Sequence, residues 1–313
     1  MNAPAGNPND TVDEWTARGR WVDVDGGSTF VVDAAPLHDT GLTPMFVLHG
    51  FPTCSYDWRS VLPELARDRR VVLFDFFGFG LSSKPDVRYS IRMYADQAER
   101  VAATLGLDAI VLVTHDMGDT VGGELLARDG EGSLAFAVER RVLTNGSIYI
   151  EMAHLTPGQQ FLLSLEDARV ELPSTSGDPG AAFKSGLAST FSAAHPASPE
   201  ELEAQYRFIT YKSGNTLMAR TIRYIEDRRA EETRFTGAIE RHPSPLGVVW
   251  GAQDPVAVHP MVARLVGARP DARVVTLDDV GHYPMIEAPV EFAAAVRNLL
   301  EPERAYPECH DPQ

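Results

Sequence analysis

The chain has 313 residues, of which 44% are hydrophobic and 9% aromatic, which is enough to bury a full-sized core. Its formal net charge of -16 and pI near 4.9 argue against nucleic acid and anionic membranes as partners, because both repel a polyanion that lacks a separate basic patch. Two cysteines, Cys54 and Cys309, are too few for a disulfide framework, and no stretch has the roughly 18 apolar residues of a membrane span, so we expect a cytoplasmic protein.

Runs rich in β-forming residues alternate with helical patterns along most of the chain. We expect strands at residues 21–24, 29–32, 45–48, 70–74, 109–114, 141–144, 246–250 and 272–277. Most of these runs consist of Val, Ile, Leu and Phe without polar alternation, as in strands that are buried on both faces. The sequence therefore predicts an α/β fold with a mostly parallel central sheet flanked by helices.

The alternation stops between residues 147 and 241, where the sequence has no convincing strand pattern. Ser198, Pro199 and Glu201 form a capping-box pattern, which predicts a helix from there to about Lys212, and a second helix is expected after Asn215. We therefore predict a core domain made of residues 13–146 and 242–304, with an inserted helical cap at residues 147–241. The chain outside residues 13–304 is expected to form loose tails.

The strand expected at 109–114 leads into Thr114-His115-Asp116-Met117-Gly118, and a helical pattern follows at once. This order places Asp116 between small residues on a sharp strand-to-helix turn, where a nucleophile elbow holds its nucleophile. A carboxylate gains nothing over water by attacking a carbonyl ester, whereas attack on an sp³ carbon that bears a leaving group yields an ordinary ester. Asp116 therefore predicts an alkylating electrophile as substrate. The alternative is that Asp116 only caps the following helix.

An ester on Asp116 can be hydrolysed only if a base activates water. In chains with this kind of nucleophile elbow, the nucleophile is followed in sequence by an acid and then by the histidine that acts as the base. His282 follows the last expected strand, and Asp254 follows the strand at 246–250. We predict His282 as the base and Asp254 as the acid that orients it, although each alone could be an ordinary loop residue. His259 lies too close to Asp254 in sequence to serve, and His115 should point away from Asp116. Three further histidines are interpreted as surface residues: His154, His195 and His242.

The strand at 45–48 leads into His49-Gly50-Phe51-Pro52, in which the glycine lets the backbone approach the site closely. We expect the backbone N–H groups of Phe51 and Met117 to form an oxyanion hole, with Pro52 beside the substrate. A plain turn after a strand is the alternative. Residues 75–82 lack the full spacing and the lysine of a phosphate-binding loop, so no cofactor is expected. No histidine pair has metal-ligand spacing, so no metal is expected either.

These motifs resemble the epoxide hydrolase and haloalkane dehalogenase branch of the α/β-hydrolase superfamily, which has an aspartate nucleophile. The resemblance covers nearly the whole chain and rests on residues 49–52, 57–58, 75–82, 115–118, 254–255 and 281–282. Within the branch, the chain is most similar to the mesoderm-specific transcript group, in residues 114–126, 143–146 and 223–225. The resemblance implies an α/β-hydrolase fold, an aspartyl-ester intermediate and a cis peptide between Phe51 and Pro52.

The resemblance also separates the candidate substrates. Haloalkane dehalogenases typically have a halide-binding tryptophan after the nucleophile and fluoroacetate dehalogenases have an arginine, whereas this chain has Met117, whose thioether offers no N–H donor. Epoxide hydrolases use a cap tyrosine to hold the epoxide oxygen. We expect Tyr224 to serve here, with Tyr206 or Tyr211 opposite, and core packing is the alternative for each of these tyrosines.

The sequence therefore predicts a hydrolase that acts on a small organic molecule, converting an epoxide to a vicinal diol through an aspartyl ester. A haloalkane dehalogenase with the same triad is the second candidate. A third candidate is a protein that binds a small ligand without turnover, but a receptor needs neither a base nor an acid that orients it. The sequence carries no signal of oligomeric state.

Overall fold

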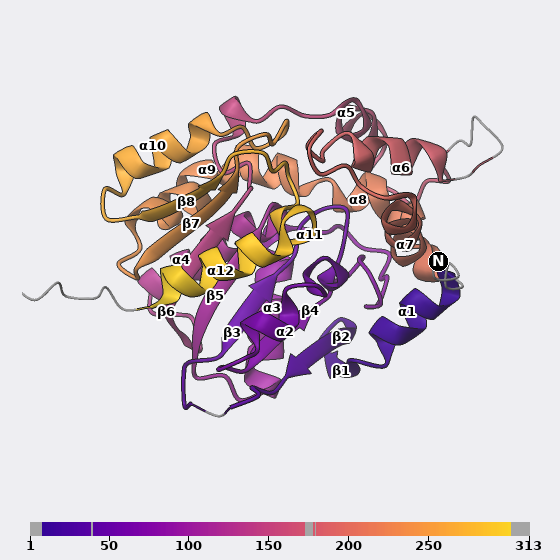
Figure 1. Ribbon diagram of the computed structural model, residues 1–313. Coiled ribbons are helices and arrows are strands. Elements are labelled where there is room, and N and C mark those ends of the chain that lie inside the picture. The colour runs from indigo at the N-terminus through magenta and orange to yellow at the C-terminus, as the bar shows by residue number, and fades with distance from the viewer. Residues whose placement is uncertain (1–7, 39, 173–177, 179, 302–313) are drawn as a thin grey trace, which may run out of the picture.

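The computed structural model describes residues 8–38, 40–172, 178 and 180–301. Within these residues, eight strands form one sheet in the order β1-β2-β4-β3-β5-β6-β7-β8 (Figure 1). The strands are β1 (Arg20–Val24), β2 (Gly27–Ala34), β3 (Met45–Leu48), β4 (Val71–Phe74), β5 (Ala109–His115), β6 (Ala137–Thr144), β7 (Leu246–Gly251) and β8 (Arg273–Leu277). β2 is antiparallel to β1 and β4, and the other neighbours are parallel. The predicted mostly parallel sheet is confirmed.

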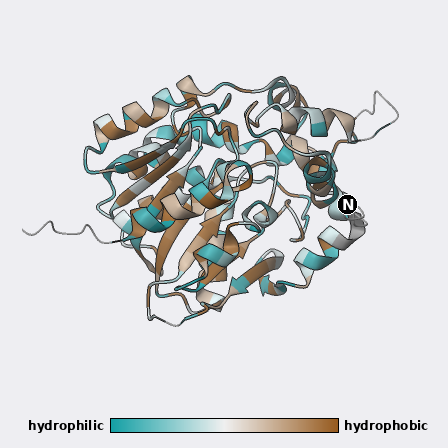
Figure 2. Cartoon of the chain, in the orientation of Figure 1, coloured by the Kyte–Doolittle hydropathy of each residue, from teal (hydrophilic) through white to brown (hydrophobic). Residues whose placement is uncertain are grey.

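Helices cover both faces of the sheet (Figure 1). One face packs against α3 (Ile91–Thr104), α4 (Met117–Gly130), α9 (Tyr224–Arg241) and α10 (Pro260–Ala268), and the other against α2 (Leu62–Leu65) and α12 (Pro289–Leu300). In β3, Phe46 and Leu48 point into the first core, while Met45 and Val47 point into the second. Figure 2 shows hydrophobic residues concentrated in the strands of the sheet. This burial on both faces explains why the strands are unbroken apolar runs.

Between β6 and β7, the described residues form helices and no strand. We call residues 147–241 the cap segment, and the predicted division of the chain into core and cap domains stays a prediction. Besides α9, the segment contains η2 (Ile150–Met152), α5 (Pro157–Ser164), α6 (Ala181–Ala188), α7 (Pro199–Thr210), η3 (Tyr211–Leu217) and α8 (Met218–Thr221). Figure 1 shows α5 to α8 grouped together on one side of the molecule. No helix in the described ranges combines the length and apolar composition needed to cross a bilayer.

The predicted start of α7 is confirmed, but its capping box is only half formed. The Ser198 hydroxyl accepts a hydrogen bond from the Glu201 N–H at 3.1 Å. The Glu201 carboxylate binds the side chains of Arg59 and Gln205 instead of returning to the cap. The helix ends at Thr210, before the predicted end near Lys212. It cannot continue because Lys212 and Ser213 have left-handed backbones, with φ of 48° and 59°.

The prediction of a loose tail before Asp13 is wrong from Pro8 onward, because α1 (Pro8–Thr16) begins there, and the rest of that tail lies outside the described residues. Trp15 holds this helix against the core and is only 2% exposed. Its ring meets the Tyr56 ring edge to face at 5.8 Å between centroids, and its indole N–H donates to the Ser55 hydroxyl at 3.2 Å. The predicted tail after Arg304 lies outside the described residues.

Truncation of Trp15 is expected to destabilise the protein. The substitution Trp15→Ala should lower the free energy of unfolding by about 3 to 5 kcal/mol, the usual effect of removing a buried large aromatic side chain. Urea unfolding followed by circular dichroism measures this change. As a control, Leu37→Ala removes a side chain that is 74% exposed and should change the same free energy by less than about 0.5 kcal/mol. Equal stability of both variants would contradict the docking of α1.

Candidate active site

Asp116 lies on the turn between β5 and α4. Its backbone has φ 49° and ψ -113°, a conformation that non-glycine residues rarely adopt. The neighbouring chain approaches closely: a Cβ on Gly50 would lie 2.6 Å from the Asp116 Cβ, and one on Gly118 would lie 2.6 Å from the Leu48 carbonyl oxygen. Glycine at these two positions therefore lets the end of β3 and the start of α4 pack against the turn.

The Asp116 carboxylate is almost completely buried and accepts a backbone hydrogen bond. The Phe51 N–H donates to its Oδ2 at 2.9 Å, and the Phe51–Pro52 peptide is cis, as expected. Met117 is the first residue of α4 and is fully buried, so its N–H is one of the first-turn donors that have no acceptor within the helix. The structure thus places both predicted oxyanion donors beside Asp116, and their catalytic role stays a prediction.

His282 and Asp254 converge on the same place from loops after β8 and β7. The Nδ1 atom of His282 is 2.7 Å from Oδ2 of Asp254, and its Nε2 atom is 4.0 Å from Oδ1 of Asp116. The first distance is a short hydrogen bond, whereas the second is longer than a direct hydrogen bond. The structure therefore brings the three predicted residues together in the expected order, with the imidazole between two carboxylates.

Asp254 is held by four hydrogen bonds, one of which comes from a residue that the sequence analysis missed. Its Oδ1 accepts from the N–H groups of Val256 at 2.7 Å and Ala257 at 3.0 Å. Its Oδ2 accepts from the Asn145 amide at 2.8 Å as well as from His282. Asn145 follows β6 with φ 43°, and its Oδ1 accepts from the Gly251 N–H at 2.9 Å. The Asn-Gly pair after a buried strand was the available signal for this left-handed turn.

The carboxylates around His282 decide its charge. Burial by itself lowers the pKa of His282, but the charge and hydrogen bond of Asp254, followed by the charges of Asp116 and Glu287, raise it to about 9. His282 is therefore an imidazolium at neutral pH. Because folding raises this pKa, the stability that the charged ring contributes is complete below about pH 6.5 and is lost as the pH rises through about 9.

The other histidines do not compete for the role of base. Burial, followed by the nearby His282, lowers the pKa of His115 to about 4, so this ring is neutral, and its Nε2–H donates to the His282 carbonyl oxygen at 2.8 Å. His259 contacts the Thr276 hydroxyl at 3.3 Å instead of Asp116. The interpretation of His242 as a surface residue is wrong, because it is buried and contacts Asp129 and Ser244, both at 2.8 Å.

A cavity of about 100 Å³ lies between the cap segment and the core, beside His282. The cavity is lined by Phe51, which donates to Asp116, and by His282, which lies next to it. The predicted substrate-binding residue Pro52 also lines it. The rest of the lining comes mainly from α5 and α6 and is mostly apolar: Gly158, Leu162, Ala182, Phe183, Gly186, Leu187, Met218 and Val256, with Thr156, Gln159, Thr190 and Tyr283. Asp116 itself does not line the cavity, and a small organic molecule there would contact Phe51 and His282, the two residues on either side of the Asp116 carboxylate.

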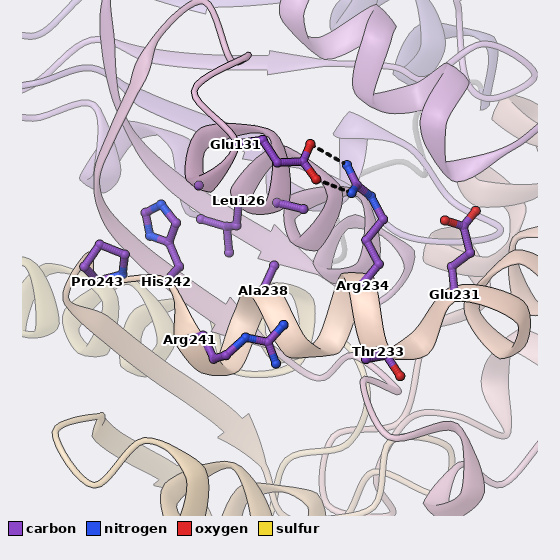
Figure 3. Close-up of a pocket in the computed structure, with 11 residues that line it drawn as sticks. Leu126, Glu131, Glu231, Thr233, Arg234, Ala238, Arg241, His242 and Pro243 are labelled. Atoms are coloured by element: carbon purple, nitrogen blue, oxygen red, sulfur yellow. Dashed lines mark hydrogen bonds and ion pairs between the residues drawn. The ribbon is translucent and has the colours of Figure 1, made fainter.

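A larger groove of about 670 Å³ lies between α4 and α9 (Figure 3). Figure 3 shows Arg234 of α9 bound to Glu131, with Arg241 and His242 further along the same wall. None of the predicted site residues lines this groove, and its lining has no nucleophile beside a histidine and its acid. The convergence of Asp116, His282 and Asp254, rather than volume, therefore identifies the candidate active site.

Of the three predicted cap tyrosines, Tyr224 lies beside Asp116. It is the first residue of α9, is 2% exposed, and its ring centroid is 5.8 Å from that of Phe51. Burial and then the Asp116 charge raise the pKa of Tyr224, and the Arg228 guanidinium, 5.1 Å from its ring centroid, opposes this rise. Arg228 was not singled out from the sequence; it is buried and donates from Nε to the Thr120 hydroxyl at 2.8 Å.

The expectation that Tyr206 or Tyr211 lies opposite Tyr224 is not met. Tyr206 packs against Phe183 and Lys184, and the Tyr211 ring faces Lys84 and Lys212, so neither lies against Phe51 as Tyr224 does. None of the three tyrosines is among the residues that line the cavity. The buried residues of α7 are Glu201, Ala204, Gln205 and Phe208. This face meets the core, since the Phe208 ring packs on Tyr56 and the Gln205 amide donates to Asp57, so α7 contributes no residue to the cavity lining.

Comparison with known proteins places the chain in a family. Residues 43–289 match the model of the alpha/beta hydrolase fold, so the protein belongs to this family of hydrolases. It is 42% identical to the putative hydrolase LipZ of Mycobacterium tuberculosis over 293 residues, 93% of this chain and 98% of that protein. It is also 31% identical to the human mesoderm-specific transcript homolog protein over 309 residues, 96% of this chain and 91% of that protein. A solved alpha/beta hydrolase fold protein from Burkholderia ambifaria superposes with a TM-score of 0.72 at 21% identity, covering 89% of this chain and 97% of that one.

Removal of the Asp116 charge should lower the pKa of His282. In Asp116→Asn the carboxylate 4.0 Å from Nε2 becomes a neutral amide, so the pKa should fall from about 9 toward 6.5. NMR titration of ring-labelled histidine measures it, and the His282 signal is the one that disappears in His282→Ala. Asp279→Asn is the control, because this side chain, three residues before His282 in sequence, contacts His195, is 69% exposed and has its charge screened by solvent. An unchanged pKa in Asp116→Asn would contradict the electrostatic coupling.

Proposed function

We propose that the protein hydrolyses a small organic electrophile through an ester on Asp116, and that the substrate is an epoxide, which becomes a vicinal diol. The observation that carries this proposal is the Asp116 carboxylate between the Phe51 N–H and the His282 ring, with Tyr224 beside it. A carboxylate nucleophile is suited to displacement at carbon, since the product is an ester that water can cleave. The similarity to hydrolases of the same fold supports the general class.

In the proposed first step, an Asp116 oxygen attacks a ring carbon of the epoxide. The carbon–oxygen bond of the ring breaks, its electron pair goes to the ring oxygen, and this oxygen takes up one proton. The Tyr224 hydroxyl donates the hydrogen bond that stabilises the developing charge. Formation of the ester removes the negative charge of Asp116, which is one of the charges that raise the pKa of His282. The imidazolium therefore becomes a better acid when the ring oxygen needs a proton.

In the proposed second step, neutral His282 takes a proton from water while the water oxygen attacks the ester carbonyl. The Asp254 carboxylate stabilises the imidazolium that forms, through the 2.7 Å hydrogen bond to Nδ1. The N–H groups of Phe51 and Met117 hold the oxyanion of the tetrahedral intermediate. Collapse of this intermediate releases the diol and restores the Asp116 carboxylate. One proton leaves His282 and one returns, so the cycle needs no other proton source.

The side chains next to Asp116 favour an epoxide over a haloalkane, because Tyr224 offers an O–H donor there although it does not line the cavity. A departing halide takes no proton and needs N–H donors, but Met117 has none in its side chain and the cavity lining includes no tryptophan. Gln159 and His282 are the lining residues with side-chain N–H groups. The size also limits the substrate, because a cavity of about 150 Å³ holds benzene, and this one measures about 100 Å³. A dehalogenase with the same three residues is the second candidate.

The covalent intermediate should accumulate when His282 is replaced by alanine. Attack by Asp116 needs no base, and in this variant solvent water supplies the proton of the ring oxygen. Hydrolysis of the ester does need a base, so the second step should slow by at least about 100-fold. Intact-protein mass spectrometry should show a gain equal to the whole mass of a small epoxide such as 1,2-epoxypropane, located by peptide mapping on the peptide that contains Asp116. With a haloalkane, the gain would fall short of the substrate mass by one hydrogen halide.

The matched control is His259→Ala, which removes a histidine that does not contact Asp116 and should leave no adduct. The double variant Asp116→Ala with His282→Ala should also remain unmodified. An adduct that forms with haloalkanes alone would replace the epoxide proposal by the dehalogenase. Absence of any adduct with either class, combined with tight binding of these compounds, would favour a ligand-binding protein.

Loss of the Tyr224 hydroxyl should slow ring opening selectively. The substitution Tyr224→Phe removes the donor for the ring oxygen and should lower the rate of adduct formation with an epoxide by about 100- to 1000-fold. Tyr211→Phe is the control, because the Tyr211 ring faces Lys84 and Lys212 outside the cavity. Stopped-flow single-turnover measurements in the His282→Ala background give this rate directly. Equal rates for both tyrosine variants would show that Tyr224 is a packing residue.

A further inference from the structure

Glu287 is a buried carboxylate that accepts hydrogen bonds from the backbone on both sides of His282. It is the last residue of α11 (Pro284–Glu287) and is 9% exposed. Its Oε2 accepts from the Gly281 N–H at 2.7 Å, and its Oε1 accepts from the Tyr283 N–H at 2.9 Å. The residues directly before and after His282 are therefore bound to one side chain. No basic side chain within the described ranges forms an ion pair with Glu287.

The same carboxylate also reaches the cap segment. Its Oε2 accepts a second hydrogen bond, from the Ser192 N–H at 3.0 Å. A return bond runs from the His282 N–H to the Thr190 carbonyl oxygen at 3.1 Å. Between these two bonds, the Phe191 ring stacks on the Tyr283 ring, with centroids 5.2 Å apart and planes at 20°. Residues 190–192 and the loop that carries His282 are thus joined by bonds in both directions.

Residues 190–192 follow directly after α6, which forms one wall of the cavity. Ala182, Phe183, Gly186 and Leu187 of α6 and Thr190 line the cavity that His282 also lines. A molecule that displaces α6 would therefore pull on the loop of His282, since buried hydrogen bonds to a carboxylate are strong and resist stretching. The wall that contacts the substrate and the base that would act on it are mechanically connected.

We propose that Glu287 is a positioning residue that fixes His282 for ester hydrolysis. Through its bond to Ser192, it also makes the position of His282 depend on the position of α6 against the core. The inference rests on the proposed function, because it assigns Glu287 to the second step of that reaction. Binding of a molecule that fits the cavity leaves the bonds at residues 190–192 intact and holds His282 in place. A molecule that is too large displaces α6, and the base moves with it.

Glu287 also contributes charge at His282. The charged or titratable groups around the His282 ring are Asp254, Asp116, Glu287, the Tyr283 ring and the neutral ring of His115. A side chain that only satisfied backbone N–H groups would affect stability alone. A positioning residue with a charge should change the titration of His282 and the lifetime of the ester, which are separate measurements.

Two substitutions separate length from charge, and a third is a control. Glu287→Gln keeps the length but loses the charge, and its amide group cannot accept all three hydrogen bonds. Glu287→Asp keeps the charge but is too short to reach all three N–H groups. Glu291→Gln removes an exposed carboxylate at the start of α12. Each variant is studied as the full chain, by NMR titration of labelled histidine, amide hydrogen exchange and single turnover of an epoxide.

Both Glu287 variants should slow hydrolysis of the Asp116 ester about 10- to 100-fold while the rate of its formation stays close to that of the unsubstituted protein. Hydrogen exchange should accelerate at residues 281–283 and at 190–192 together. Only Glu287→Gln should lower the pKa of His282, and Glu291→Gln should change none of these quantities. If Glu287→Gln does not fold, Glu287→Asp still tests hydrolysis and exchange.

Unchanged ester lifetime and unchanged exchange at residues 190–192 in a folded Glu287 variant would overturn the inference. Faster exchange at residues 281–283 alone would also overturn it, because the base loop would then be independent of the cap. Failure of the proposed function has a different signature. In that case no variant forms an adduct, including His282→Ala, while the exchange and the titration still report whether Glu287 couples His282 to α6.

Discussion

The structure of the site depends on the strained turn at Asp116, where three chain segments meet at distances that only glycine allows. Gly50 and Gly118 let the end of β3 and the start of α4 approach the turn. Gly146, after β6, has the same role: a Cβ there would lie 1.9 Å from Oδ2 of Asp119, one turn into α4. This crowding holds Asp116 at φ 49° and leaves its carboxylate facing the Phe51 N–H. A larger side chain at Gly50 would meet Asp116 itself, and one at Gly118 or Gly146 would displace the segments that pack around the turn.

The second constraint is the arrangement of charge in a buried space. A single imidazolium lies between the carboxylates of Asp116 and Asp254, and Asp254 is fixed by backbone and amide donors. A further buried acid, Asp119, lies nearby, and burial raises its pKa well above the usual value, which disfavours a second negative charge there. Its neighbour Thr114 donates to its Oδ1. When Asp116 is esterified, the His282 imidazolium has one carboxylate beside it instead of two. This loss of charge would allow His282 to donate a proton in the first step and to accept one in the second.

Much of the fold and the order of the site residues could be predicted because their signals are local. Each buried strand is a continuous apolar run, and Asp116, Asp254 and His282 directly follow such runs. Asn145 and Glu287 could not be predicted in this way, since their partners come from segments far away in sequence. The tyrosines failed for another reason: the apolar pattern of a cap helix predicts its buried face but not the surface that this face meets, and α7 packs on the core at Asp57 instead of lining the cavity. The helix before Asp13 depends on Trp15, a single buried anchor without a surrounding pattern.

The apolar lining of the small cavity has a consequence for how the proposed reaction ends. An epoxide has one weak acceptor oxygen, whereas the vicinal diol formed from it has two hydroxyl groups. A hydroxyl that loses its water without gaining a partner costs about 1 to 3 kcal/mol in a protein interior. Walls such as Leu162, Leu187 and Met218 offer no such partner. The apolar walls of the cavity should therefore bind the epoxide better than the diol. The diol would then leave readily and inhibit the proposed reaction only weakly.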